Sequence, residues 1–398
     1  MEHWQAQQAL AAALARAEPG RDLAAPAAPS FPPRDICFAR LREDAAFVQA
    51  WRRLEGKAAL PTQSHAFTAA LADTLLTGSD LRVFVAPGPG GLAALLPLCR
   101  DSGPLARWRL AGADEVFEPV DLLCRDPAAA RDLALALARQ SRPLDLDRIP
   151  SGSPLIPALQ AAMKSRGLVS IRPSTPSPTI KLDAGWQEPE SQFNAGRRSD
   201  FRRAARRAKE QGEVAYEIVS PGPDAFDDLF DEAIAVELRS WKREAGTAIA
   251  ADPAKERFFR AYFRAASEAG SLRIALLRIG GRVVAMQMAL ESRGRYWLFK
   301  IGFDEAYSRC SPGTLLMLHM IGWAARRGLV AFELLGDVEP WIALFWTREQ
   351  HDCVRLRSYP FNPAGAAAFA ADGAIWLRRR LERRAEKIAH DALTRKPV

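Results

Sequence analysis

The chain has 398 residues, of which 48% are hydrophobic and 26% are charged, and its formal net charge is +8. This size and composition predict a soluble globular protein that holds two domains or a duplicated one. Its five cysteines are widely spaced and include no C-x-x-C pair, which argues against a disulfide framework and a zinc site and favours a reducing compartment. The longest apolar run, near 313–325, is too short to cross a bilayer.

The positive charge is concentrated in two short segments. Between Arg197 and Lys209 there are seven basic residues and one acidic residue, and from Ala374 to Val398 there are eight basic residues and three acidic ones. The rest of the chain is therefore slightly acidic. Because the positive charge is local, it indicates contact with particular anionic surfaces.

A proline- and alanine-rich linker at 20–34 separates a helical N-terminal piece, residues 1–34 with the linker, from a body that begins near Asp35. Residues 1–16 begin with an acid and hold only a short apolar stretch, which is not typical of a cleaved signal sequence. We therefore expect a cytoplasmic location.

Two segments about 190 residues apart form a weak internal repeat. DLRVFVAPGPGGLAALLPL at 80–98 resembles SLRIALLRIGGRVVAMQMAL at 271–290, and both have the pattern of a β-hairpin with a Gly-Gly turn. An apolar helical pattern precedes each hairpin, at 67–76 and at 258–266. The repeat predicts that one α/β unit is duplicated, although two amphipathic hairpins can also resemble each other by chance.

Other elements follow from periodicity and turn residues. A strand is predicted at 144–148, and the proline-rich segment 150–178 is predicted to be an ordered connection between the two halves. Helices are predicted at 127–140, 153–166, 199–211 and 224–241. The third of these is basic and is closed by Gly212.

The stretch 296–341 is the most informative part of the chain. Its aromatic run at 296–303 has strand composition, helical spacing follows at 314–325, and a second strand is predicted at 330–335. A strand that leads into a helix start and then into a further strand is a common setting for an anion site.

The start of that helix has the residues that an anion site needs. Ser311 can act as the cap, and Pro312 suits the first helical position because its missing N–H would be unpaired there. Gly313 lets another molecule approach the backbone, and the free amides and the helix dipole both favour phosphate. An ordinary capped helix that binds nothing is the alternative.

Three segments add to the repeat: SWKREAGTAI at 240–249, KIGFDEAYSRCSPG at 300–313 and ELLGDVEPW at 333–341. With these motifs the chain resembles the double-domain GNAT-fold acyltransferases, a group that includes cellulose-biosynthesis-type acetyltransferases and the FemAB aminoacyl transferases. The resemblance implies an α/β fold of tandem GNAT-like domains, with mixed, splayed β-sheets flanked by helices.

The resemblance also implies how the chain is divided. We expect a GNAT-like N-terminal half at 35–178, a C-terminal half at 179–365 that carries the acyl-carrier site, and a basic amphipathic C-terminal helix at 366–398. Its apolar residues lie among many arginines, as in helices that rest on a membrane surface.

In this fold the pantetheine of acyl-CoA lies where two parallel strands diverge, and the pyrophosphate sits on the following helix start. The cofactor-binding candidates are therefore Arg309, Ser311, Gly313 and Thr314. The family pattern R/Q-x-x-G-x-G/A is degenerate here, because the only glycine comes one position late. FemAB-like members with such loops use aminoacyl-tRNA, so the carrier is expected to be CoA, with acyl carrier protein or tRNA as alternatives.

The chain most resembles the bacterial ceramide synthase type found in sphingolipid-making bacteria. This implies transfer of a long-chain acyl group from acyl-CoA to the amine of a lipid long-chain base, at the inner face of the cytoplasmic membrane. Acetylation of an exopolysaccharide or its precursor, a FemAB-like aminoacyl transfer, and a non-catalytic membrane or RNA adaptor are the alternatives. Nucleic acid is disfavoured as a partner, and no metal is expected.

Amide formation requires a neutral amine, whereas a free alkyl amine has a pKa of ~10.4, so a base or a desolvated pocket must favour its deprotonation. Asp337 and Glu339 follow a predicted strand end, where open α/β sheets bind their ligands. Glu237, on a helix, is a further candidate. Each of the three can instead be an ordinary solvated charge.

Lys300 lies in the middle of an apolar strand, where an unpaired ammonium is costly. It is expected to face a cleft or to form a structural ion pair with Asp304 or Glu333. Its positive charge could alternatively stabilise the thioester oxyanion or bind a substrate phosphate. Tyr307 could protonate the departing thiolate, although a packed turn tyrosine is more common.

Two further groups of residues are candidates for binding. Those expected at the substrate are Trp241, Lys242, His319 and Glu333, of which the histidine also suits a packed core position. Those expected to contact a membrane headgroup or a phosphate are Arg197, Arg198, Arg202 and Arg206. A solvated helix face is the alternative for the arginines.

Overall fold

The computed structural model describes residues 35–394 apart from 89–90, 104, 241–248 and 338. The predicted N-terminal piece at 1–34 and the candidates Trp241 and Lys242 therefore lie outside the described residues.

Two sheets form the framework. The first has the strand order β1 (Asp35–Cys37), β2 (Asp80–Gly88), β3 (Gly91–Arg100) and β4 (Arg109–Leu110), with β5 (Leu123–Cys124) paired to β3. The second has the order β6 (Leu144–Pro150), β13 (Gln350–Pro360), β7 (Gly167–Lys181), β12 (Ala331–Glu333), β11 (Arg295–Phe303), β10 (Arg282–Ser292), β9 (Leu272–Ile279) and β8 (Val214–Val219).

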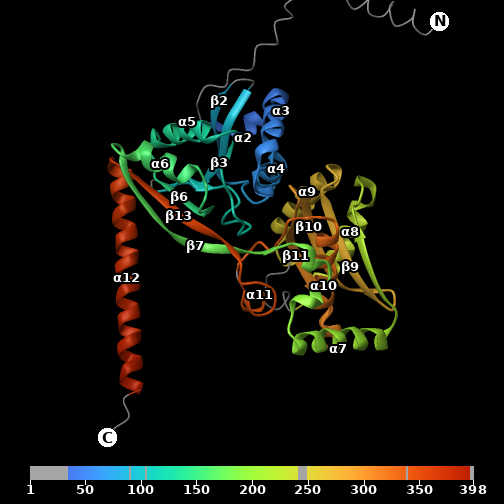
Figure 1. The fold of residues 1–398 in the computed structure, drawn as a ribbon. Coiled ribbons are helices and arrows are strands. Elements are labelled where there is room, and N and C mark those ends of the chain that lie inside the picture. Colours follow the sequence, from blue (N-terminus) through green and yellow to red (C-terminus); the bar gives the residue numbers. More distant parts are fainter. Residues whose placement is uncertain (1–34, 89–90, 104, 241–248, 338, 395–398) are drawn as a thin grey trace, which may run out of the picture.

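Helices cover both sheets (Figure 1). Those before the middle of the chain are α2 (Phe38–Leu41), α3 (Ala45–Leu54), α4 (His65–Asp73), α5 (Pro127–Ala138) and α6 (Leu155–Met163). Those after it are α7 (Ala195–Gln211), α8 (Pro223–Glu237), α9 (Pro253–Glu268), α10 (Pro312–Arg326), α11 (Pro340–Phe345) and α12 (Pro363–Thr394).

The predicted internal repeat is present as two hairpins. β2 pairs with β3 and β9 pairs with β10, both antiparallel, and each hairpin follows a helix, α4 in the first case and α9 in the second. Alternation along β9 shows how the second hairpin is buried on both faces. Ile274 and Leu276 pack with the core beneath α8 and α9, whereas Ala275 and Leu277 pack with the core beneath α7 and α10.

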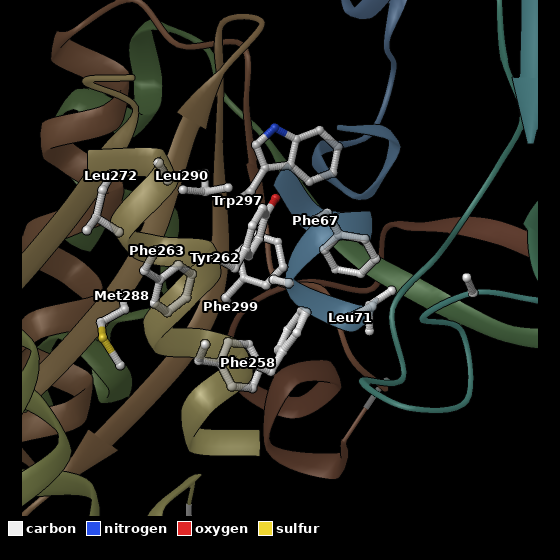
Figure 2. Packing of buried hydrophobic residues seen from close by; sticks show 14 of the residues in the cluster. Phe67, Leu71, Phe258, Tyr262, Phe263, Leu272, Met288, Leu290, Trp297 and Phe299 are labelled. Atoms are coloured by element: carbon white, nitrogen blue, oxygen red, sulfur yellow. The ribbon is translucent and has the colours of Figure 1, made fainter. Parts of the chain in front are cut away.

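The two preceding helices also hold the halves together. Phe67 of α4 packs edge-on against Phe258 and Tyr262 of α9, with ring centroids 5.5 and 5.2 Å apart. Figure 2 shows Leu71 on the same face of α4 and Phe299 of β11 beside Tyr262. One continuous apolar core therefore joins the first half to the second, and burial of such large aromatic side chains strongly stabilises that arrangement.

The segment 150–178 is more regular than predicted. Residues 167–181 form one long strand, β7, which crosses between the halves (Figure 1). Its first part pairs with β13 alone, whereas its end, from Thr179 to Lys181, pairs with β12. Strand edges without a second partner tolerate proline, because its missing N–H donor is not needed for a ladder there. Pro173, Pro176 and Pro178 obscured this strand in the sequence pattern.

The strand β13 links distant parts of the chain. It follows the second half in sequence, yet it inserts between β6 and β7 of the first. The range 179–365 that we expected to form the second half therefore contributes one strand to the first. Such a long-range pairing has no local sequence signal.

Two charged helices lie at the periphery. α7 begins at Ala195, with the Asn194 side chain accepting from the Arg197 amide at 3.0 Å, so the helix starts four residues before the predicted 199. α12 projects away from the body (Figure 1). Among the described residues, no helix is long and apolar enough to cross a membrane.

Candidate active site

The site lies where β11 and β12 separate. These parallel strands pair only over Arg295–Trp297 and Ala331–Glu333. Beyond this point β11 continues to Phe303, and on the other side the chain leaves β12 toward α11. Among the described residues, no strand pairs with β11 on this side after Trp297.

A β-bulge lies on the same stretch of β11. Met288 of β10 pairs with Lys300, but the next residue, Ala289, pairs with Leu298, which leaves Phe299 opposite no residue. Bulges interrupt the ladder and re-aim the backbone, and they often occur beside active sites.

Two adjoining pockets lie between β11 and the chain after β12. The first, here called the α10 pocket, has a volume of about 270 Å³ and is lined by Ile301, Gly302, Phe303, Gly313, Thr314, Met317, Glu339, Trp341 and Trp346. The second, the Lys300 pocket, is about 340 Å³ and is lined by Val116, Phe117, Glu118, Leu298, Phe299, Lys300, Ile301, Leu334, Leu335, Gly336, Asp337, Glu339, Trp341 and Ile342. They share Ile301, Glu339 and Trp341, so they lie side by side, and the two together are called the cleft below.

The start of α10 forms one end of the cleft. Ser311 is the N-cap residue in a left-handed conformation, with φ of 46°, and its side chain makes no capping hydrogen bond, contrary to the predicted role as side-chain cap. Gly313 lies so close to Phe303 that a Cβ atom would meet the ring at 3.2 Å. The Gly313 amide is thus beside the pocket, whereas the Thr314 amide donates to the Ser311 carbonyl at 3.0 Å.

The corresponding helix of the first half begins differently. The Asp126 carboxylate caps α5 and accepts from the Ala129 amide at 2.9 Å. A carboxylate at this place occupies the helix start and repels a phosphate. The second half is therefore the better place for an anion.

An arginine-lined hollow continues outward from the α10 pocket. This arginine pocket, of about 290 Å³, is lined by Arg197, Asp200, Phe201, Arg203, Ala204, Arg207, Arg309, Ser311, Thr314 and Phe345. It shares Thr314 with the α10 pocket. The Arg207 side chain donates to the Arg309 carbonyl at 3.3 Å, and the Arg197 guanidinium lies 3.8 Å from the centre of the Phe345 ring.

The four arginines predicted on α7 for headgroup or phosphate contact therefore divide between two faces. Arg197 lines the arginine pocket, whereas Arg198, Arg202 and Arg206 are not among its lining residues. Arg198 donates to the Phe193 carbonyl at 2.6 Å, while Arg202 and Arg206 are exposed. Arg203 and Arg207 complete the pocket, which their i, i+4 spacing explains.

Lys300 and the two predicted carboxylates of 334–341 lie along the same cleft. Lys300 and Asp337 line the Lys300 pocket, and the Lys300 ammonium is 4.2 Å from the centre of the Phe259 ring. Glu339 borders both pockets and accepts a hydrogen bond from the Trp341 indole. The two carboxylates proposed as partners of Lys300 form ion pairs with other residues. Asp304 accepts from Arg239 and Arg282 at 2.7 and 2.8 Å.

Glu333 has other partners as well. It is 1% exposed and accepts from Arg295 and from His351, the latter at 3.0 Å. Burial raises the pKa of Glu333, but the hydrogen bonds from His351 and Arg295 outweigh burial and hold that pKa below its usual range. Glu333 is not among the residues that line the cleft. Its ion pairs favour a structural role at the point where β11 and β12 separate.

The other predicted site residues lie outside the lining of these three pockets. Glu237 is fully buried and accepts from the Ile249 amide at 2.8 Å. His319 stacks on Tyr216 with ring centroids 4.1 Å apart, and burial, with a contribution from Arg326, lowers its pKa. Tyr307 packs against the core with the Arg282 guanidinium 5.9 Å from its ring centre. For the histidine and the tyrosine, the packed alternatives fit this geometry.

The sequence patterns did not single out Glu118. It comes from the first half, yet it lines the Lys300 pocket of the second half and is 6% exposed. The Gly336 amide donates to its carboxylate at 3.0 Å. Burial raises the pKa of Glu118 to about 7, although the Gly336 hydrogen bond and the charges of Arg148 and Lys300 lower it.

Arg148 connects the loop that carries Glu118 to the chain after β12. It is 1% exposed, it donates to the carbonyls of Phe117 and Gly336, and its guanidinium lies 4.3 Å from the centre of the Phe117 ring. The loop with Glu118 and the chain after β12 are thereby fastened to the same side chain. The only sequence signal for Glu118 is an acid inside a short apolar run, VFEPV at 116–120.

Comparisons with known proteins agree with this architecture. Residues 195–341, from α7 to the start of α11, match the family model described as an acetyltransferase (GNAT) domain. The chain therefore carries a GNAT acyltransferase domain, and the predicted enzyme class is confirmed. The matched range contains β11, β12, α10 and the arginines of α7.

Solved structures extend the likeness to both halves. FemX is similar with a TM-score of 0.51 at 11% identity, covering 79% of this chain and 96% of FemX. A conserved protein of unknown function from Bacteroides thetaiotaomicron VPI-5482 is similar with a TM-score of 0.50 at 11% identity, covering 78% and 97%. These likenesses concern the fold, and they confirm the predicted α/β class with paired GNAT-like units. A comparison with the curated proteins finds no match.

Proposed function

We propose that the chain transfers a long-chain acyl group from acyl-CoA to the amine of a lipid long-chain base at an anionic membrane surface. The observation that carries this proposal is the order of three adjoining pockets, here called the path. The arginine pocket adjoins the α10 pocket at Thr314, and the α10 pocket adjoins the Lys300 pocket at Ile301, Glu339 and Trp341. A polyanionic carrier with an acyl thioester at its far end fits the order of these environments.

The phosphates of the carrier would occupy the arginine pocket and the first turn of α10. Arginine recognises phosphate through paired, charge-assisted hydrogen bonds, and helix amides add donors there. Arg203, Arg207 and Arg309 supply the charge, while Thr314 belongs to both adjoining pockets. Arg309, Ser311, Gly313 and Thr314, the candidates from the sequence, all border this part of the path.

The pantetheine arm and the acyl group would lie beside β11. An extended arm would lie along the part of β11 from Leu298 to Phe303, where no described strand pairs with β11 on the side of β12. Ile301, Phe303, Met317 and two tryptophans give the α10 pocket an apolar lining, which suits the pantetheine arm between the phosphates and the Lys300 pocket.

The transfer itself would take place near Lys300. Attack on a thioester places negative charge on the carbonyl oxygen, and a preorganised cation in a partly dry pocket stabilises that charge. Lys300 can do this from the bulged part of β11. Asp337 and Glu339 border the same pocket, where they can orient the acceptor amine.

Exposed apolar and basic residues support work at a lipid surface. Leu344 and Phe345 of α11, next to the cleft, are 68% and 40% exposed. On α12, Trp376, Leu377 and Leu381 are exposed beside Arg378, Arg379 and Arg380. A combination of bulky apolar side chains and arginines binds the headgroup region of anionic bilayers.

The test is to incubate the protein with palmitoyl-CoA or acetyl-CoA and one of three acceptors: sphinganine, glucosamine or water. Mass spectrometry follows the products. We expect an amide from palmitoyl-CoA and sphinganine, and a strong loss of rate in Lys300→Met with CoA affinity retained. No amide with any acyl chain would refute the proposal. Acetyl transfer to glucosamine alone would support the polysaccharide alternative, and transfer only from aminoacyl-tRNA would support a FemAB-like reaction.

A further inference from the structure

The first half supplies one buried carboxylate to the cleft of the second. Glu118 lies on the chain between β4 and β5, whereas Lys300 and Gly336 belong to β11 and to the chain after β12. Its carboxylate accepts from the Gly336 amide at 3.0 Å through one oxygen, Oε2. Because Glu118 lines the pocket, it is available to a ligand there.

The position of Glu118 is fixed from both sides. Arg148 of β6 binds the carbonyls of its neighbour Phe117 and of Gly336, so the two loops keep one geometry. Gly336 itself has φ of 58°, a left-handed conformation that suits glycine and turns its amide toward the carboxylate. A buried acid held this firmly is unusual unless its partners or its chemistry require it.

The electrostatic surroundings keep Glu118 between its two protonation states near neutral pH. Burial in the pocket raises its pKa to about 7, while the Gly336 amide, Arg148 and Lys300 act against burial. Other titratable groups near it are Tyr262 of α9, whose own pKa Glu118 helps to raise, and Asp337 and Glu339 across the pocket. A general base works best when its pKa is close to the working pH.

We infer that Glu118 is the acid–base residue of the transfer, supplied by the first half to the acyl-carrier cleft of the second. This inference rests on the proposed function, and it assigns to the cleft an acceptor with a primary amine. It also explains why the first half is present although α5 carries a carboxylate in place of an anion site. The first half completes the chemistry of the second.

In this reaction the amine nitrogen attacks the thioester carbonyl carbon. A C–N bond forms, and the nitrogen passes one proton to the Glu118 carboxylate. The C–S bond then breaks, the electron pair stays on sulfur, and protonated Glu118 returns the proton to the thiolate. The products are an amide and free CoA thiol, and Glu118 regains its starting state, so no other reactant is needed.

Three variants test the role. Glu118→Gln keeps an oxygen that accepts from the Gly336 amide but cannot take a proton, so the fold and the CoA affinity should remain. Its kcat should fall by about 100-fold or more. The rise of wild-type kcat/KM with pH, centred near pH 7, should disappear. Glu118→Ala should regain activity with added formate, whereas Glu118→Asp should keep part of the rate.

The outcomes distinguish a failure of the role of Glu118 from a failure of the proposed function. Sphinganine acylation by Glu118→Gln at the wild-type rate, with an unchanged pH profile, would overturn the role of Glu118 and leave the proposed function intact. Failure of the wild-type protein to bind CoA or to acylate any amine would overturn the proposed function and this inference with it. A loss of activity in Glu118→Gln that comes with a lower melting temperature, and without formate rescue in Glu118→Ala, would assign Glu118 a structural role instead.

Discussion

Removing charge from one face of α7 should weaken CoA binding, whereas removing the same charge from the other face should not. Arg203 and Arg207 line the arginine pocket. Arg202 and Arg206 are exposed on the same helix and do not line it. The double variants Arg203→Gln/Arg207→Gln and Arg202→Gln/Arg206→Gln therefore form a matched pair with equal change in net charge.

The expected loss of CoA affinity follows from the interaction energy of two charges that are exposed to water. Two unit charges about 5 Å apart in water interact by about 0.8 kcal/mol. Loss of two such interactions costs about 1.6 kcal/mol, which raises the dissociation constant roughly 15-fold. Asp200 pairs with Arg203 at 2.9 Å and opposes the phosphate, so Asp200→Asn should strengthen CoA binding.

Isothermal titration calorimetry with CoA and with pantetheine measures this effect. The pocket-facing pair should lose CoA affinity, the outward pair should keep it, and pantetheine, which lacks the diphosphate, should bind both variants equally. The difference should shrink as salt is raised, because the groups are exposed. Equal weakening in both double variants, or none in either, would refute the assignment of the arginine pocket to the carrier phosphates.

Three further changes probe the framework and the cleft. Phe67→Ala should lower the free energy of unfolding by about 3–4 kcal/mol in urea titrations because it opens the core between the halves, while Phe361→Ala, at a site 68% exposed, should change it little; similar losses in both would contradict that view of the interface. The pKa of Glu333 is held below its usual range, so its ion pairs stabilise the fold above the unfolded-state pKa of about 4.3 and that stability is lost as the pH falls through the folded-state pKa. Wild type should therefore lose more stability between pH 7 and pH 3 than Glu333→Gln, and parallel losses would be evidence against these ion pairs. Gly313→Ala places a methyl group 3.2 Å from the Phe303 ring, at the edge of the α10 pocket; in protein with an unchanged circular-dichroism spectrum the CoA affinity should fall at least about 10-fold, and unchanged affinity would move the carrier away from this helix start.

Local sequence patterns predicted much of the secondary structure of the second half. The Gly-Gly turn and the alternation on either side predicted the hairpin of β9 and β10, and helical spacing after Pro312 predicted α10. These elements depend mainly on neighbours in sequence, so their signals survive in a single chain.

Local sequence patterns did not predict the pairing of strands that lie far apart in the chain. β13 reaches the sheet by pairing with β6, about 200 residues earlier in the chain, and the prolines of β7 are permitted only because that strand has a single neighbour over most of its length. The helix predicted at 199–211 begins earlier, at Ala195, because Asn194 caps it.

The same contrast between local and long-range signals applies to the site residues. Lys300 and Gly313 were recognisable because a charge in an apolar strand and a glycine at a helix start are locally unusual. Glu118 was not, because its burial depends on Arg148 and Gly336, which come from β6 and from the chain after β12. Residue types in isolation cannot report a pocket that two halves build together.

A crystal structure of the protein with bound CoA tests the central claim most directly. The account predicts phosphates beside the Gly313 amide and among Arg203, Arg207 and Arg309, with the pantetheine arm along β11 and its thiol directed to the Lys300 pocket. CoA bound at the start of α5, or bound with its thiol outside the cleft between β11 and the chain after β12, would contradict it.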